Sequence, residues 1–220
     1  MWSERKKAID ALNNALQEEA RLIYKGFELT NEIIQFLYDA SEPISFLTVC
    51  GLVLLKGRNL GQGIFSLALD GLAQEAGALL RPTIECIELL EYFRKDPKKI
   101  EEAIEGKLPP AGDIAKKIDG RLKGLRDYLN RNASHFSFTP GARLHLIDWR
   151  NENVKLKQLY TEKVLRTNLR DLFLILLLLA SAAVKCLDTC GRLPDSILRR
   201  LNLWRRKGLR AVAPELRNFV

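Results

Sequence analysis

The side chains best suited to chemistry lie in the segment 122–138, LKGLRDYLNRNASHFSF. If this segment is helical as far as residue 135, Tyr128, Arg131 and His135 share one face, about 180° from the apolar seam of the same helix. Histidine titrates near neutral pH and arginine is always charged, so this pair could move a proton and hold a phosphate. Such a group could cleave RNA without a metal ion, with His135 as acid or base, Arg131 stabilising phosphate charge and Asn132 nearby.

The same three side chains have a second interpretation. Tyr128, Arg131 and His135 would also share a face if that face were simply solvated, or if it met another subunit, with His135 ending the helix. The spacing alone does not separate the two interpretations.

A second polar group lies in an otherwise apolar helix, GLAQEAGALLRPTIECIELLEYF, at residues 71–93. A helix that is apolar on almost every side belongs in the middle of a bundle. We therefore expect residues 64–95 to form the central helix, kinked by Pro82. Arg81 and Glu85 should then be buried as an ion pair, so that Arg81→Leu would unfold the protein. The narrow polar stripe of this expected helix comprises Asp70, Gln74, Arg81, Glu85, Glu88 and Tyr92.

The elements that must position these residues are almost all helical. Apolar residues recur at threes, fours and sevens from Ser3 to about residue 40, with a break expected near Gly26. Between 136 and 154 the helical period is lost, and residues 144–149 read as half of a small hairpin. The fold class is therefore all-α, a bundle of about six helices with a short irregular or β-hairpin insertion near 137–155. The further helices are expected at 44–56, before a turn at 57–63, and at about 97–105, 113–135, 160–187 and 195–207.

The totals fit one cytoplasmic domain with a tail. The chain has 220 residues, 47% of them hydrophobic and 28% charged, and its first ten residues are too polar for a secretory signal. The longest apolar runs, 44–55 and 172–184, are shorter than the roughly 20 residues that cross a bilayer, so we expect no membrane span.

We expect neither a cofactor nor a metal ion. The four cysteines should be reduced thiols in apolar helical contexts. Cys186 and Cys190 share a helix face, but neither of the two histidines is close to them in sequence, so core packing explains the pair better than a metal site.

The positive charge is concentrated at the C-terminal end, so we divide the chain into a bundle domain at 1–191 and a basic amphipathic helix and tail at 192–220. The tail holds eight arginines and lysines and two acids. It could bind phosphates, a membrane surface or an acidic partner; the alternative is a helix whose apolar side docks on the bundle while its arginines face water. The binding candidates are Arg199, Arg200, Arg205, Arg206 and Lys207.

Two segments carry a family resemblance. The pattern EA..LLRPTIE...LLEYF followed by LRDYLNRNASHFSF resembles a group of bacterial all-α proteins of mostly unassigned function, and more distantly the HEPN superfamily of helical bundles. Many HEPN members are metal-independent ribonucleases of bacterial defence systems, and their motif helices meet across a dimer axis. The resemblance places the family's Arg–polar–His motif on Arg131, Asn132 and His135, although three residues separate Arg from His here and four to six do in the family.

Two functional hypotheses follow. The first is a HEPN-like, homodimeric RNA-binding protein or ribonuclease of a bacterial defence or stress system. The second is a non-catalytic dimeric interaction or scaffold module, whose basic tail docks an acidic protein partner.

Overall fold

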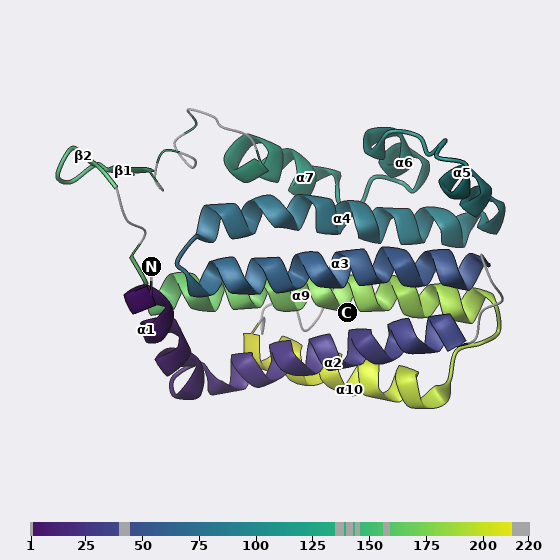
Figure 1. Cartoon of the computed structure of the whole chain (residues 1–220), viewed down its shortest axis with the longest axis horizontal. Helices are drawn as coiled ribbons and strands as arrows, with labels where there is room; N and C mark the ends of the chain where they lie inside the picture. Colours follow the sequence, from purple (N-terminus) through teal and green to yellow (C-terminus); the bar gives the residue numbers. More distant parts are fainter. Residues whose placement is uncertain are drawn as a thin grey trace.

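Helices dominate the computed structural model, which describes residues 2–39, 45–134, 139, 143, 146–155 and 159–212 (Figure 1). The all-α class and the hairpin insertion are confirmed. These residues contain nine α-helices, where about six were expected. Six of them have twelve residues or more, and the other three, α5 to α7, are short. In chain order the elements are α1 (Trp2–Asn13), α2 (Gln17–Asp39), α3 (Phe46–Leu69), α4 (Ala73–Lys95), η1 (Pro97–Lys99), α5 (Ile100–Ile104), α6 (Ala111–Lys117), α7 (Lys123–Leu129), η2 (Asn130–Ser134), β1 (Ile147–Asp148), β2 (Asn153–Val154), α9 (Glu162–Thr189) and α10 (Asp195–Val212).

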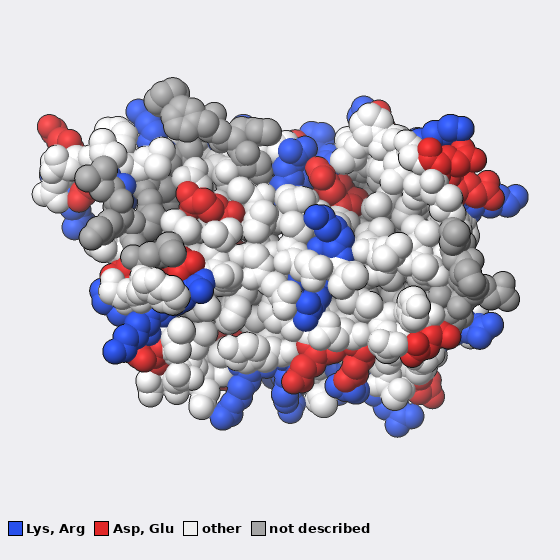
Figure 2. Space-filling model, in the orientation of Figure 1, with Lys and Arg blue, Asp and Glu red and all other residues white. Residues whose placement is uncertain are grey.

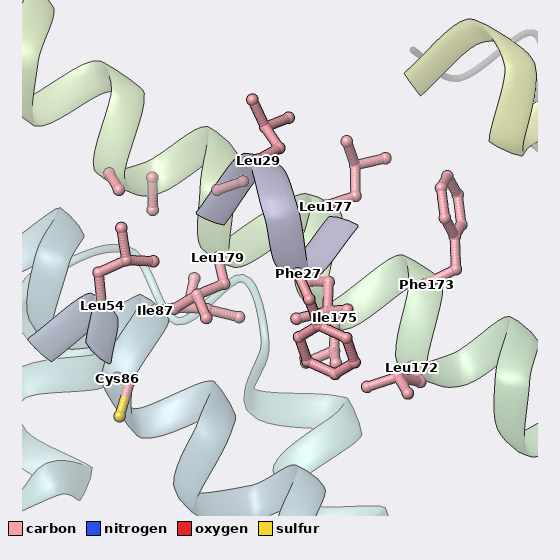
Figure 3. Packing of buried hydrophobic residues seen from close by; sticks show 14 of the residues in the cluster. Phe27, Leu29, Leu54, Cys86, Ile87, Leu172, Phe173, Ile175, Leu177 and Leu179 are labelled. Atoms are coloured by element: carbon pink, nitrogen blue, oxygen red, sulfur yellow. The ribbon is translucent and has the colours of Figure 1, made fainter. Parts of the chain in front are cut away.

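The central helix is α9, not the expected helix at 64–95. Helices α2, α3 and α4 lie side by side, α10 lies along α2, and α9 contacts all four of them (Figure 1). Phe173, Leu176 and Leu179 of α9 are fully buried. Phe27 of α2, Leu54 of α3 and Ile87 of α4 belong to the same core, and Figure 3 shows them together with Phe173 and Leu179. The apolar run of α9 is therefore used to fill the middle of the bundle.

Helix α9 is long and apolar enough, by length and composition alone, to cross a membrane. In this fold 67% of its most apolar stretch is buried by the rest of the protein, as in the core helix of a globular protein.

Helix α3 runs without interruption through residues 57–63, where a turn was expected. Its glycines mark contacts between helices: a Cβ on Gly57 would lie 2.8 Å from a methyl carbon of Leu179, and one on Gly61 would lie 3.2 Å from Leu176. The chain turns instead at Gly71, whose φ of 79° favours glycine. These glycines therefore bring α3 close to α9, and the expected helix at 64–95 is divided between α3 and α4.

The N-terminal helix is broken ten residues earlier than expected. Residues 14–16 form a turn between α1 and α2, in which the Asn14 side-chain amide donates to the carbonyl of Asp10 and Leu16 is fully buried. Gly26 lies inside α2, where a Cβ would be 2.5 Å from Cζ2 of Trp204 in α10. Gly26 therefore admits a ring from another helix and does not end its own.

The single helix expected at 113–135 is two short helices and a π-helical turn. Asp119 and Gly120 both have positive φ, 71° and 58°, and separate α6 from α7. At its C-terminal end α7 widens into η2. The hairpin is small, with Ile147 paired with Val154 and Asp148 with Asn153 in antiparallel register.

Helix α10 shares the core of the bundle. Ile197, Leu201 and Trp204 are buried against α2 and α9. The indole nitrogen of Trp204 donates to the carbonyl oxygen of Leu22 at 2.9 Å, and its ring meets that of Phe173 edge-on at 5.0 Å. The apolar side of the basic helix is therefore docked on the bundle, as the second interpretation of the tail expected.

Candidate functional site

The residues of the expected RNA-cleaving group lie at the junction of α7 and η2. Tyr128 is 58% exposed and Arg131 is also exposed. Nε of Arg131 donates to the carbonyl of Asp127 at 3.2 Å, and the side-chain amide of Asn132 donates to the carbonyl of Tyr128 at 2.9 Å. His135 lies outside the described residues. The described part of this site therefore offers an exposed aromatic ring and an exposed cation, the latter bonded to its own helix.

The π-helical turn is anchored on α4. The side-chain amide of Gln74 donates to the carbonyl of Asn132 at 3.2 Å, and the methyl group of Ala133 would lie 3.4 Å from a Cβ on Gly77. The hydroxyl of Thr139 also contacts the Asn132 side-chain oxygen, at 3.1 Å. These contacts fix the backbone of η2 and leave Arg131 at the surface.

The expected buried ion pair of α4 is not buried. Nη2 of Arg81 and Oε1 of Glu85 are 3.3 Å apart, but each side chain keeps about a third of its surface exposed, 33% and 32%. The reason is the way α4 is covered: α3 and α9 pack on one side and α6 and α7 on another. The edge that carries Arg81 and Glu85 is left between these neighbours.

The buried pair is formed by Glu88 of α4 and Arg126 of α7. Nη1 of Arg126 lies 3.0 Å from Oε2 of Glu88, and the two side chains are 12% and 3% exposed. The same Nη1 donates to the carbonyl of Ala111 at 3.2 Å. Burial raises the pKa of Glu88, and the neighbouring Arg126 opposes this rise. Glu88 belongs to the polar stripe that the sequence shows. In a helical projection of the sequence, Arg126 falls toward the apolar seam, so it was not expected to pair with Glu88.

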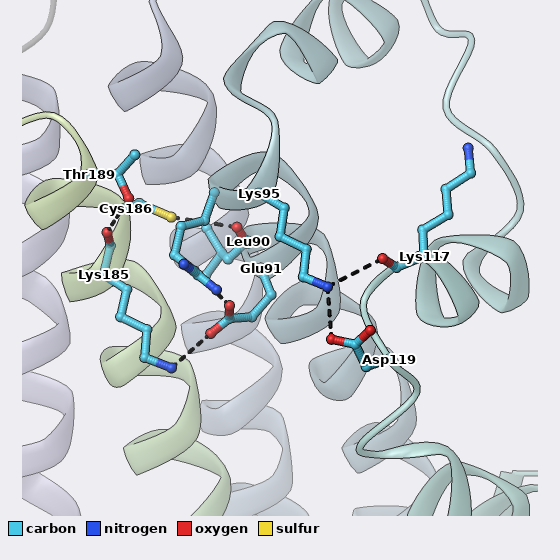
Figure 4. A network of polar contacts seen from close by, with 9 residues as sticks. Leu90, Glu91, Lys95, Lys117, Asp119, Lys185, Cys186 and Thr189 are labelled. Atoms are coloured by element: carbon cyan, nitrogen blue, oxygen red, sulfur yellow. Dashed lines mark hydrogen bonds and ion pairs between the residues drawn. The ribbon is translucent and has the colours of Figure 1, made fainter.

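A network of ion pairs joins the C-terminal end of α4 to its neighbours (Figure 4). Glu91 accepts from Nε of Arg94 at 2.7 Å and from Lys185 of α9 at 3.1 Å. Lys95 binds Asp119 at 2.8 Å, across to the turn between α6 and α7. Although burial alone would raise it, the pKa of Glu91 is lowered by its hydrogen bonds from Arg94 and Lys185. Each cation of this network is paired with Glu91 or Asp119, so the network joins α4 to α9 and to the turn between α6 and α7.

A groove of about 530 Å³ runs between α2 and α10. Its floor is apolar and includes Leu22, Leu29 and the buried ring of Trp204. Two acids, Glu18 and Glu28, also line it. Five basic side chains line the groove: Arg21 and Lys25 from α2, and Arg200, Lys207 and Arg210 from α10. We name these five residues the basic groove set. Figure 2 shows basic and acidic side chains along this edge of the molecule.

The acidic side chains nearby do not form ion pairs with all the cations of the basic groove set. Arg200 forms an ion pair with Glu32 of α2. In the described part of the chain, Arg21, Lys25 and Lys207 are exposed and form no ion pair. Three exposed cations from two helices therefore face one groove.

The five expected binding residues of the tail are only partly brought together. Arg200 and Lys207 line the groove. Arg199 lies outside it, 3.9 Å from Asp195, and Arg206 is exposed but does not line the groove. Arg205 is half-buried and does not line the groove either. The partners from α2, Arg21 and Lys25, were missed because nothing in the sequence pairs α2 with α10.

Three of the four cysteines have the properties of packing residues, whereas the packing role expected for Cys190 is wrong, because this residue lies at the C-terminal end of α9. Cys50, Cys86 and Cys186 are buried, and Cys190 is exposed. Burial raises the pKa of Cys86 to about 11, so its thiol is protonated at neutral pH. A search over the described residues finds no group of three or more His, Cys, Asp or Glu side chains that could hold a metal ion.

Comparison of the chain with protein family models, with curated proteins and with solved structures gave no match.

Proposed function

We propose that this protein binds RNA through the basic groove set between α2 and α10. The observation that supports the proposal is the convergence of five cations from two helices on one groove, three of them exposed and without an ion pair among the described residues. Cations in such an arrangement bind a polyanion by neutralising its charges and releasing its counterions.

The groove favours contacts with phosphates over recognition of bases. Trp204 is 5% exposed and its indole nitrogen is already bonded to Leu22, so it offers no surface on which a base could stack. Leu203, which is 47% exposed, is the apolar side chain that a bound chain can touch at the rim. Binding should therefore depend strongly on salt and little on RNA sequence.

The test is the salt dependence of binding to a short unstructured single-stranded RNA, measured by fluorescence anisotropy. In the triple variant Arg21→Gln, Lys25→Gln and Lys207→Gln, the logarithm of affinity against the logarithm of salt concentration should lose about 0.7 in slope per contact, about two in all. The matched control is Lys6→Gln, Lys98→Gln and Lys163→Gln, which removes the same charge from exposed sites away from the groove. Equal losses in both variants, or binding that ignores salt, would overturn the proposal.

The alternative hypothesis, a non-catalytic interaction module, predicts that a different polyanion competes for the groove. If the groove docks an acidic protein, polyglutamate should displace the RNA at the same concentration of negative charges, and the triple variant should lose affinity for polyglutamate equally. RNA that stays bound against excess polyglutamate supports the RNA-binding proposal.

Ribonuclease activity is a second candidate, supported by the π-helical turn that leaves Arg131 and Tyr128 exposed together. Turns of this kind occur often at functional sites. The turn packs on α4 while the groove lies along α2, on the opposite side of the bundle (Figure 1). RNA held in the groove is therefore not presented to Arg131 of the same molecule. RNA cleavage in EDTA that is lost in His135→Ala and in Arg131→Ala would support the activity, and its absence would leave binding alone.

A further inference from the structure

The carboxylate of Glu88 is only half used by the protein. Oε2 is bound to Arg126, whereas Oε1 is buried and has no hydrogen-bond partner among the described residues. A buried carboxylate oxygen without a donor is costly, and in native proteins such an atom calls for an explanation, for example a water or an ion bound to it. The side chain is 3% exposed, so bulk water does not solvate it freely.

Glu88 also lines a cleft of about 280 Å³ between α3, α4 and the segment that leads into α6. The cleft is mostly apolar, with Leu60, Leu89, Leu108 and Ile114 among its lining residues. Apart from Glu88, its charged lining consists of Lys56 and Glu85, of opposite sign. The cleft therefore combines an apolar wall with Glu88, a residue whose second carboxylate oxygen is buried and lacks a donor among the described residues.

We propose that this cleft binds a small, uncharged apolar molecule that carries one N–H or O–H donor, and that the donor binds Oε1 of Glu88. Small-molecule sites have this composition, an apolar lining with few polar groups that fix orientation. A neutral donor suits Oε1 better than a cation, because Arg126 already balances the charge of Glu88 and Arg81 is paired with Glu85. The site does not involve the basic groove set, so this proposal does not depend on RNA binding.

Indole and benzofuran are suitable probes because they have nearly the same shape and differ in a donor. Indole carries an N–H group where benzofuran carries an acceptor oxygen. A hydrogen bond to a charged, buried acceptor should make indole bind about tenfold or more tightly than benzofuran. The measurement is a titration followed by two-dimensional NMR, with saturable shifts expected for the backbone of Leu60, Leu89 and Ile114.

The substitution Glu88→Gln should remove this preference. Arg126 can only donate, so the carbonyl oxygen of the new side-chain amide should turn toward it, and the NH₂ group should replace Oε1 in the cleft. Indole should then lose about tenfold in affinity and benzofuran should lose little. Glu75→Gln is the matched control, because it makes the same change at an exposed position of α4 and should leave both affinities as they are.

A further variant guards against a folding defect in Glu88→Gln. Leu108→Trp adds a large ring at the half-buried rim of the cleft and leaves the ion pair intact, so it should block both probes. Three results would overturn the proposal: no saturable shifts with indole, equal affinities for the two probes, or an unchanged preference in folded Glu88→Gln protein.

Discussion

At the residue scale, the ion pair between Glu88 and Arg126 is the contact that ties α7 to the bundle. Both groups are desolvated, and Arg126 also satisfies the carbonyl of Ala111 at the start of α6. By contrast, Arg81 and Glu85 keep a third of their surface in water, so their attraction is screened. Both pairs include a glutamate of α4 and differ in burial, so they can be compared directly.

We expect Arg126→Leu to cost about 3–5 kcal/mol of unfolding free energy, because it leaves the Glu88 carboxylate buried without a counter-charge. Arg81→Leu, the change that the sequence alone marks as severe, should cost about 0–1 kcal/mol. Urea denaturation of both variants measures the difference. Equal costs would show that burial does not set the value of these pairs.

The cost of Arg126→Leu should also depend on pH. The pKa of Glu88 is already raised by burial, and removing Arg126, which opposes that rise, should raise it further. A carboxyl group whose pKa is raised by folding stabilises the native state at low pH and loses that contribution as pH rises through its folded pKa. The deficit relative to the parent protein should therefore grow as pH rises above about 4, the range in which an unfolded glutamate loses its proton. A deficit that shrinks over this range would contradict the assignment.

At the element scale, glycines set how closely the helices approach. The positions of Gly26 and Gly208 both admit rings from a neighbouring helix, Trp204 in one case and Phe173 in the other. A glycine inside a helix is costly for the isolated helix, and here the close packing compensates. These residues therefore look like helix breakers in the sequence and act as contacts in the fold.

We expect Gly208→Ala to destabilise the protein by about 1–3 kcal/mol although alanine favours helix. The new Cβ would lie 2.0 Å from Cζ and 2.1 Å from Cε2 of Phe173, a ring that is fully buried and cannot move aside. Gly124→Ala is the control, because nothing lies within 4 Å of its Cβ position, and it should stabilise by up to about 1 kcal/mol. Thermal unfolding of the two variants should shift in opposite directions.

At the scale of the whole molecule, α10 belongs to the same hydrophobic core as the bundle. Its buried side chains meet α2 and α9, and the Trp204 ring meets Phe173 in the centre of α9.

The surface in the view of Figure 2 is uncharged over much of its middle, and Leu52 of α3 is 61% exposed. Homodimer formation stays a prediction from the sequence.

A chain that ends at residue 191 should therefore fail to fold cooperatively. Removing α10 exposes the apolar faces of α2 and α9 that it covers, including Phe173. Near-ultraviolet circular dichroism and size-exclusion chromatography should show lost tertiary packing and aggregation. A monomeric fragment that unfolds in one sharp transition would show that residues 1–191 are an independent domain.

The sequence by itself determined the fold class, the presence of an irregular or hairpin insertion near 137–155, and the amphipathic character of the basic C-terminal helix. These features follow from local periodicity and turn residues, which act between neighbours in the chain. Only the tertiary structure decided that α9 is central, that Glu88 pairs with Arg126, and that Arg21 and Lys25 join Arg200 and Lys207 at one groove. The reason is that burial and pairing depend on which helices meet, and contacts between residues far apart in the chain leave no periodic signal in it.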